Sequence, residues 1–167
     1  MKNLLILCAG AVSLLMLADS AIADSGRLRG RGPHGVVVAG HHNGNSHIRG
    51  RRHQTNSDGS FTTASRGAFS HNNGAHGARQ ATSTVNPDGS AVHSGNAHVS
   101  GVRGTASTSG SFARDNAGNA TGARSSTVTA ANGNTYTGTT AYDKANGFTH
   151  SGTCRNASGA TITCPNR

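Results

Sequence analysis

Residues 58–74, DGSFTTASRGAFSHNNG, contain the pattern that decides the fold. An alternating segment lies between two polar clusters, and each cluster ends in glycine. Alternation with a period of two that includes Thr and aromatic residues indicates a β-strand. Within Ser60–Ser70, the alternation puts Phe61, Thr63, Ser65 and Phe69 on one face, and Ser60, Thr62, Ala64 and Arg66 on the other.

The glycine-terminated cluster recurs about every 15 residues, as in repeat architectures. Residues 105–114 and 134–143 alternate in the same way. Asp-Gly and Asn-Gly are favoured in two-residue hairpin turns, in which both central residues take a positive φ. The pattern predicts an all-β, antiparallel meander of about eight strands, with a stacked β-solenoid as the alternative. The marking glycines are Gly59, Gly74, Gly89, Gly104, Gly118, Gly133, Gly147 and Gly159.

The composition predicts little hydrophobic core. The chain has 167 residues, of which 24 are glycine, none is tryptophan and only 4% are aromatic. Burial of apolar surface stabilises a fold by about 25 cal/mol per Å², and ordering opposes folding by about 1–2 kcal/mol per residue. Stability should therefore come from backbone pairing, from a disulfide or from assembly with other copies.

The first 23 residues have the layout of a secretory signal peptide. Lys2 precedes an apolar run from Leu4 to Leu17, and Ala21-Ile22-Ala23 forms a small-x-small cleavage site. The run is shorter than the roughly 20 residues of a membrane-spanning helix. We expect a mature chain from Asp24 that is secreted or periplasmic, or attached to the cell surface, and that has no transmembrane segment.

Cys154 and Cys164 are the two cysteines that remain after this cleavage. A pair of cysteines in an exported chain predicts a disulfide, here across the last predicted turn. The alternative is a metal site with two thiolate ligands, which are too few for zinc.

Residues 24–55 are rich in Gly and Arg and poor in apolar residues, which predicts a flexible arm before the repeat domain of residues 56–167. The formal net charge of the chain is +9, and a basic chain tends to bind polyanions. The Arg-Gly pairs of the arm resemble nucleic-acid-binding segments. Because no aromatic residue lies between them, no specific nucleic-acid recognition is expected. The predicted polyanion-binding residues are Arg27, Arg29, Arg31, Arg49, Arg51 and Arg52.

Histidines of the arm are candidate ligands for weak binding of Zn, Cu or Ni, since neutral imidazole binds these ions. No carboxylate or thiolate accompanies them at a fixed spacing, so solvated histidines are the alternative. No other cofactor and no enzymatic activity are expected, because the aspartates lie in predicted turns, where they bond locally. The candidate metal ligands are His34, His41, His42, His47 and His53.

Segments such as Pro87-Asp88-Gly89-Ser90 and Asn132-Gly133-Asn134-Thr135-Tyr136 resemble those of small secreted bacterial repeat proteins rich in Gly, Ser and Thr. The general layout is also similar to that of curlin, although Gln54 and Gln80 are the only glutamines. The resemblance implies an exported β-repeat protein with a structural or adhesive role at the cell surface or in the extracellular matrix. Self-assembly and binding to anionic surface polymers are the expected interactions. The alternatives are a periplasmic His-rich metal-binding protein and a secreted cationic effector.

Overall fold

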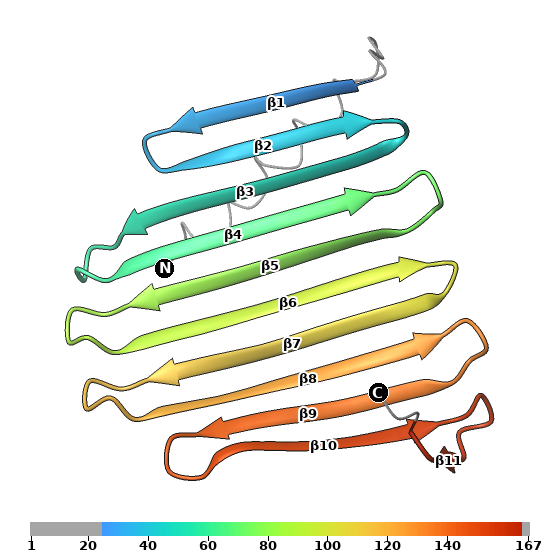
Figure 1. Cartoon of the computed structure of the whole chain (residues 1–167). Coiled ribbons are helices and arrows are strands. Elements are labelled where there is room, and N and C mark those ends of the chain that lie inside the picture. The colour runs from blue at the N-terminus through green and yellow to red at the C-terminus, as the bar shows by residue number, and fades with distance from the viewer. Residues whose placement is uncertain (1–24, 165–167) are drawn as a thin grey trace, which may run out of the picture.

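A computed structural model describes residues 25–164, which form one open antiparallel sheet in a single layer (Figure 1). The predicted signal peptide, residues 1–23, lies outside the described residues. The order of the strands in the sheet is their order in the sequence. The strands are β1 (Ser25–Gly32), β2 (Gly35–His42), β3 (Asn45–Thr55), β4 (Phe61–Ser70), β5 (His76–Val85), β6 (Ala91–Gly101), β7 (Gly104–Arg114), β8 (Ala120–Ala130), β9 (Thr135–Asp143), β10 (Gly147–Arg155) and β11 (Thr161–Ile162).

The predicted all-β meander is confirmed, with eleven strands rather than about eight. Each strand pairs antiparallel with the next strand in the sequence, so the alternative of a stacked solenoid does not apply to the described residues. The additional strands come mainly from the segment that the composition assigned to a flexible arm.

The prediction of a flexible arm is wrong for residues 25–55, which form β1, β2 and β3 of the same sheet. β3 pairs with β4 along its length, from Ser46↔Ser70 to Thr55↔Phe61. The proposed boundary at residue 55 therefore falls in a hairpin turn between two paired strands. Composition failed here because strands of Gly and Arg can gain their order from a neighbouring strand rather than from apolar burial.

Most turns lie where the glycines placed them, but their type differs from the prediction. In the β3–β4 turn the N–H of Asn56 donates to the carbonyl of Ser60 (2.8 Å), and the N–H of Gly59 donates to the carbonyl of Asn56 (3.0 Å). Of the residues in this loop only Gly59 has a positive φ, of 81°. This is the three-residue loop in which a type I turn is followed by a left-handed glycine. The same bonds recur in the turns of Gly74, Gly89, Gly118, Gly133 and Gly159.

Among the turns of residues 25–164, only Asn43-Gly44 has the predicted two-residue geometry, in which both central residues have a positive φ; the values are 48° and 74°. The prediction that Asp58 and its equivalents take a positive φ is therefore wrong. The aspartate instead precedes the left-handed residue and accepts a hydrogen bond from the backbone that follows it.

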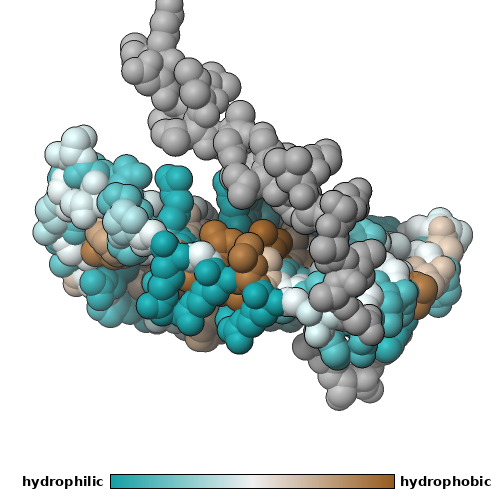
Figure 2. Space-filling view, turned by 90° about the horizontal axis from the view of Figure 1, so that it is seen from above, coloured by the Kyte–Doolittle hydropathy of each residue, from teal (hydrophilic) through white to brown (hydrophobic). Residues whose placement is uncertain are grey.

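The sheet encloses no core within residues 25–164. Among these residues the buried apolar side chains are those of Val38 (7% exposed) and Cys154 (5%), and the buried polar one is Ser60. Figure 2, which views the sheet from above, shows hydrophobic side chains only in small patches among hydrophilic ones. Backbone pairing and contacts between side chains of neighbouring strands must hold this fold together.

Candidate functional site

The two faces of the sheet differ in chemistry. Residues paired across an antiparallel ladder lie on the same face, and successive residues lie on opposite faces. His47 pairs with Phe69 and Phe69 with Gly77 on one face, while Ile48 and Ala68 pair on the other. We call the face of His47 the basic-aromatic face and that of Ile48 the hydroxyl face. The register puts all six Phe and Tyr residues on the basic-aromatic face, namely Phe61, Phe69, Phe112, Tyr136, Tyr142 and Phe148.

The hydroxyl face carries a regular grid of Ser and Thr across β7, β8, β9 and β10. The backbone positions of these residues are about 4.8 Å apart between adjacent strands and about 6.7 Å apart at alternate positions of one strand. All eight residues at the centre of the grid are exposed. They are Ser107, Ser109, Ser125, Thr127, Thr137, Thr139, Ser151 and Thr153.

Five of the six predicted polyanion-binding arginines share the basic-aromatic face. Arg29 and Arg49 align on either side of Val38, and Arg31 and Arg51 align on either side of Val36. The backbone positions of neighbouring arginines are therefore about 10 Å apart across β2 and about 7 Å apart along each strand. Arg27 lies on the same face, whereas Arg52 pairs with Gly35 and lies on the hydroxyl face. A hollow of ≈ 220 Å³ is lined by residues that include Arg31, Arg51 and His53.

Two further arginines extend the charged area, and the sequence analysis missed both. Arg79 aligns with Arg49 across Gly67, and its Nε lies 3.7 Å from where a Cβ of Gly67 would be. The Nε of Arg124 donates to Oγ1 of Thr108 (2.8 Å). The sequence showed that Arg79 and Arg124 lie within predicted strands. That both lie on the basic-aromatic face follows only from the pairing register over several hairpins.

A shallow groove of ≈ 560 Å³ crosses the sheet between these arginines. Its apolar lining includes Val99, Ala106 and Val128. Two aromatic rings also line it, Phe69 on β4 and Tyr136 on β9, which are five strands apart. The cationic lining residues are Arg49, Arg79 and Arg124, and the side chain of His47 also lines the groove. No Asp, Asn or Gln lines this groove. The groove therefore offers cationic groups and flat apolar surface without competing carboxylates.

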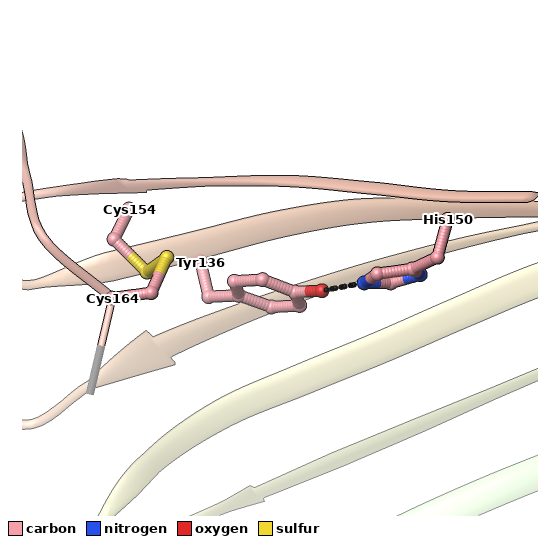
Figure 3. The surroundings of a disulfide bond; sticks show 4 residues. All are labelled: Tyr136, His150, Cys154 and Cys164. Atoms are coloured by element: carbon pink, nitrogen blue, oxygen red, sulfur yellow. Dashed lines mark hydrogen bonds between the residues drawn. A yellow bond between two sulfur atoms is a disulfide. The ribbon is translucent and has the colours of Figure 1, made fainter. Parts of the chain in front are cut away.

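Tyr136 has a defined position at one end of the groove. Figure 3 shows its ring between the Cys154–Cys164 disulfide and His150. The Tyr136 hydroxyl and Nε2 of His150 are 3.0 Å apart, and Nδ1 of His150 lies 2.9 Å from Oγ1 of Thr140. The hydroxyl end of the ring is therefore held by a polar network, and one edge of the ring faces the disulfide.

Rings of the basic-aromatic face lie over glycines. A Cβ at Gly152 would lie 2.7 Å from Cε2 of Tyr136, and a Cβ at Gly138 would overlap the Tyr136 hydroxyl. His47 covers Gly40 and Phe69 covers Gly77 in the same way, at 2.6 and 2.8 Å. In each case the ring covers backbone atoms that a glycine, which has no side chain, would otherwise leave exposed. A second aromatic group joins Phe112, Tyr142 and Phe148, with ring centroids 6.2 and 4.7 Å apart.

The predicted disulfide is confirmed. It joins Cys154 of β10 to Cys164, with a Cα–Cα distance of 5.3 Å. β11 pairs with β10 only at Cys154↔Ile162 and Arg155↔Thr161. The bond thus fastens a two-residue strand that backbone pairing alone would hold weakly.

The described aspartates are turn residues. Oδ1 of Asp58 accepts bonds from the backbone N–H of Ser60 (2.9 Å) and from its hydroxyl (2.6 Å). The hydroxyl bond, followed by the backbone bond, holds the pKa of Asp58 below its ordinary value of 3.8. The same two bonds from Ser90 lower the pKa of Asp88, and those from Asn119 lower that of Asp115. Oδ1 of Asp143 accepts hydrogen bonds from the backbone N–H groups of Ala145 and Asn146 in the turn that follows.

The predicted metal ligands do not gather at one point. His34 and His53 are neighbours, with ring centroids 6.4 Å apart, while His47 lies over Gly40. His41 and His42 are consecutive residues of β2 and so lie on opposite faces. Within the described residues no group of three or more His, Cys, Asp or Glu is placed to hold an ion. Weak binding of Zn, Cu or Ni stays a prediction.

No segment of residues 25–164 forms a helix long and apolar enough to traverse a bilayer. Comparison of the chain with protein-family models, with curated proteins and with solved structures found no match.

Proposed function

We propose that this protein is a non-enzymatic bacterial surface or matrix protein, exported from the cell, that acts as a scaffold or adhesive. The observation that carries the proposal is that, within residues 25–164, the sheet has no second layer on either face and ends in two edge strands. An enzyme needs reactive groups held in an enclosed site, whereas extended, accessible surface suits repeated contacts with polymers or with other copies.

The edges favour self-association. Among residues 25–164, β11 covers only Cys154 and Arg155 of β10, so the backbone groups of residues 147–153 that point away from β9 have no partner strand there. This segment, GFTHSGT, carries no Lys, Arg or Asp, and Phe148 is 78% exposed. Edge strands that are long and uncharged pair readily with another chain. At the other edge, β1 carries Arg27, Arg29 and Arg31, which oppose pairing between two copies of β1.

The test is assembly of the chain from Asp24 onward, followed by light scattering and electron microscopy. We expect concentration-dependent particles or fibres that the edge variant Thr149→Lys/Ser151→Lys slows at least about tenfold, because a charged edge resists pairing. The matched control is Ser107→Lys/Ser109→Lys, which adds the same charges to the same face of an interior strand. A chain that remains monomeric at high concentration, or equal slowing by both pairs, contradicts self-assembly through this edge.

Adhesion is tested separately by sedimentation with anionic polymers. The aligned arginines of β1 and β3 support it, and we expect Arg29→Gln/Arg31→Gln to reduce co-sedimentation with heparin and with lipopolysaccharide. Co-sedimentation that is insensitive to this pair and to salt contradicts polyanion binding.

A further inference from the structure

We infer that the groove of the basic-aromatic face binds an extended single-stranded nucleic acid without sequence preference. The inference rests on the proposed adhesive function and names the polymer that one of its surfaces takes. The groove is distinct from the six arginines that the sequence analysis singled out, since only Arg49 belongs to both sets.

The folded sheet brings aromatic side chains next to the basic ones. The arm sequence lacks the interleaved aromatic residues of nucleic-acid-binding Arg-Gly segments, but the sheet supplies them from other strands. Phe69 of β4 pairs directly with His47 of β3, and Tyr136 lies in the same row five strands further on. Aromatic faces within a basic groove are the features that bind unstacked bases.

The groove carries positive charge without a nearby carboxylate. Arg49, Arg79 and Arg124 line it, and none of the described aspartates is among its lining residues. Arg79 lies across Gly67, and the bond from Arg124 to Thr108 aims that guanidinium over β7. All three arginines are exposed, so they can meet phosphates without rearrangement of the backbone. A linear polyanion that crosses the strands would meet the three in turn.

The side chains that line the groove favour nucleic acid over an acidic polysaccharide. Sugar hydroxyls are best met by side chains that both donate and accept, such as carboxamides, or that accept, such as carboxylates. The groove has neither, and its hydroxyl side chains are those of Thr108 and Ser126. Its flat apolar strip of Val99, Ala106 and Val128 suits planar bases better. The open, shallow shape favours a single strand, whose bases are free to stack on protein.

The experiment measures fluorescence anisotropy of a labelled oligo-deoxythymidylate long enough to cross the sheet, with the chain from Asp24 onward. We expect Arg79→Gln/Arg124→Gln to weaken binding about tenfold or more and to reduce the slope of log K against log salt by about 1.4, the value for two lost phosphate contacts. The matched control is Arg66→Gln/Arg155→Gln, two exposed arginines of the hydroxyl face, which should change both quantities much less.

Stacking has its own readout. Tyr136→Phe keeps the ring and should bind like the parent chain, whereas Tyr136→Ala should weaken binding about tenfold, the scale of one lost base stack. Amide exchange of β9 and β10 is recorded for both variants, so that loss of binding is compared between folded proteins.

Several outcomes overturn the inference. If the groove variant and the control variant lose the same oligonucleotide affinity, binding depends on net charge alone and not on the groove. Duplex DNA bound as tightly as the single strand removes the argument from stacking. Binding of heparin, or of phosphatidylglycerol vesicles, without binding of the oligonucleotide assigns the groove to another partner and leaves the proposed scaffold or adhesive function intact. Loss of assembly through β10 contradicts that function without affecting the oligonucleotide result.

Discussion

At the scale of single residues, glycine has two separate tasks in this sheet. In the turns it takes left-handed backbone conformations, as Gly59 does at φ 81°. In the strands it leaves room for a ring from the neighbouring position, as Gly138 and Gly152 do beneath Tyr136. The sequence predicted the first task because the turn pattern is local. The second depends on which residues face each other across the ladder, so it emerged only from the register.

Gly138→Ala tests the second task. The new methyl group would overlap the Tyr136 hydroxyl, so the ring must leave its place between the disulfide and His150. We expect a loss of about 1–3 kcal/mol in the free energy of unfolding, typical of overpacking, and a changed tyrosine signal in near-ultraviolet circular dichroism. Gly26→Ala is the control, because a Cβ there would meet no atom within 4 Å. Equal effects of the two substitutions would contradict a ring seated on Gly138.

The turn aspartates predict a pH dependence. Bonds from Ser60 and Ser90 hold the pKa of Asp58 and Asp88 below 3.8 in the folded chain. A group whose pKa is lowered by folding stabilises the fold above its unfolded pKa, and this contribution is lost as the pH falls through the folded pKa. Stability in urea should therefore be flat above about pH 5 and decline below pH 4. Asp58→Asn/Asp88→Asn keeps an acceptor in each turn and should flatten this decline, and an unchanged decline would assign it to other groups.

At the scale of elements, hairpin turns set the positions of the strands and neighbouring strands supply their order. The alternation of Ser60–Ser70 and the glycine period predicted most of β4 to β10 because both signals are local. β1 and β3 were missed because each is rich in Arg and Gly and has only one apolar side chain, Leu28 or Ile48, which is too few to mark a buried face. The disulfide was predictable from cysteine number alone. The groove was not, because Arg49, Arg79 and Arg124 meet only through the summed register of β3 to β8.

Gly89→Ala tests the turn geometry without any steric clash. Gly89 has a φ of 83°, and a Cβ built there meets no atom within 4 Å, so the cost is that of the backbone conformation alone. We expect a loss of about 1–2 kcal/mol in the free energy of unfolding. Gly30→Ala of β1 adds the same methyl group into open space at an ordinary φ and should be close to neutral. Similar values for the two variants would contradict the left-handed turn.

At the scale of the whole molecule, the sheet behaves as a chain of local interactions. Within the described residues, backbone contacts join only strands that follow one another in sequence, although side chains such as Phe112 of β7 and Tyr142 of β9 reach across one strand. Stability should then be the sum of neighbouring interfaces, and damage at one end should not spread far. Such a molecule can lose its end strands while the middle remains folded.

Removal of the disulfide tests this locality. Cys164→Ser should speed amide exchange at Thr161 and Ile162 and at the facing end of β10, because β11 keeps only two paired residues. Exchange in β5 and β6, several strands away, should change by less than about twofold, since repeat-like stability is local. Uniform acceleration across the sheet would instead indicate one cooperative unit. The variant should also assemble faster, because more of the β10 edge becomes free.

Because the strands follow one another in the sheet in sequence order, the width of the sheet can change by whole hairpins. From Gly59 to Gly89 the chain runs out and back once, over 89 − 59 = 30 residues. Insertion or deletion of one such unit would leave the direction and the facing of every later side chain unaltered, so a gene could lengthen or shorten the protein by whole hairpins. Both surfaces would then grow together, each gaining the same number of rows.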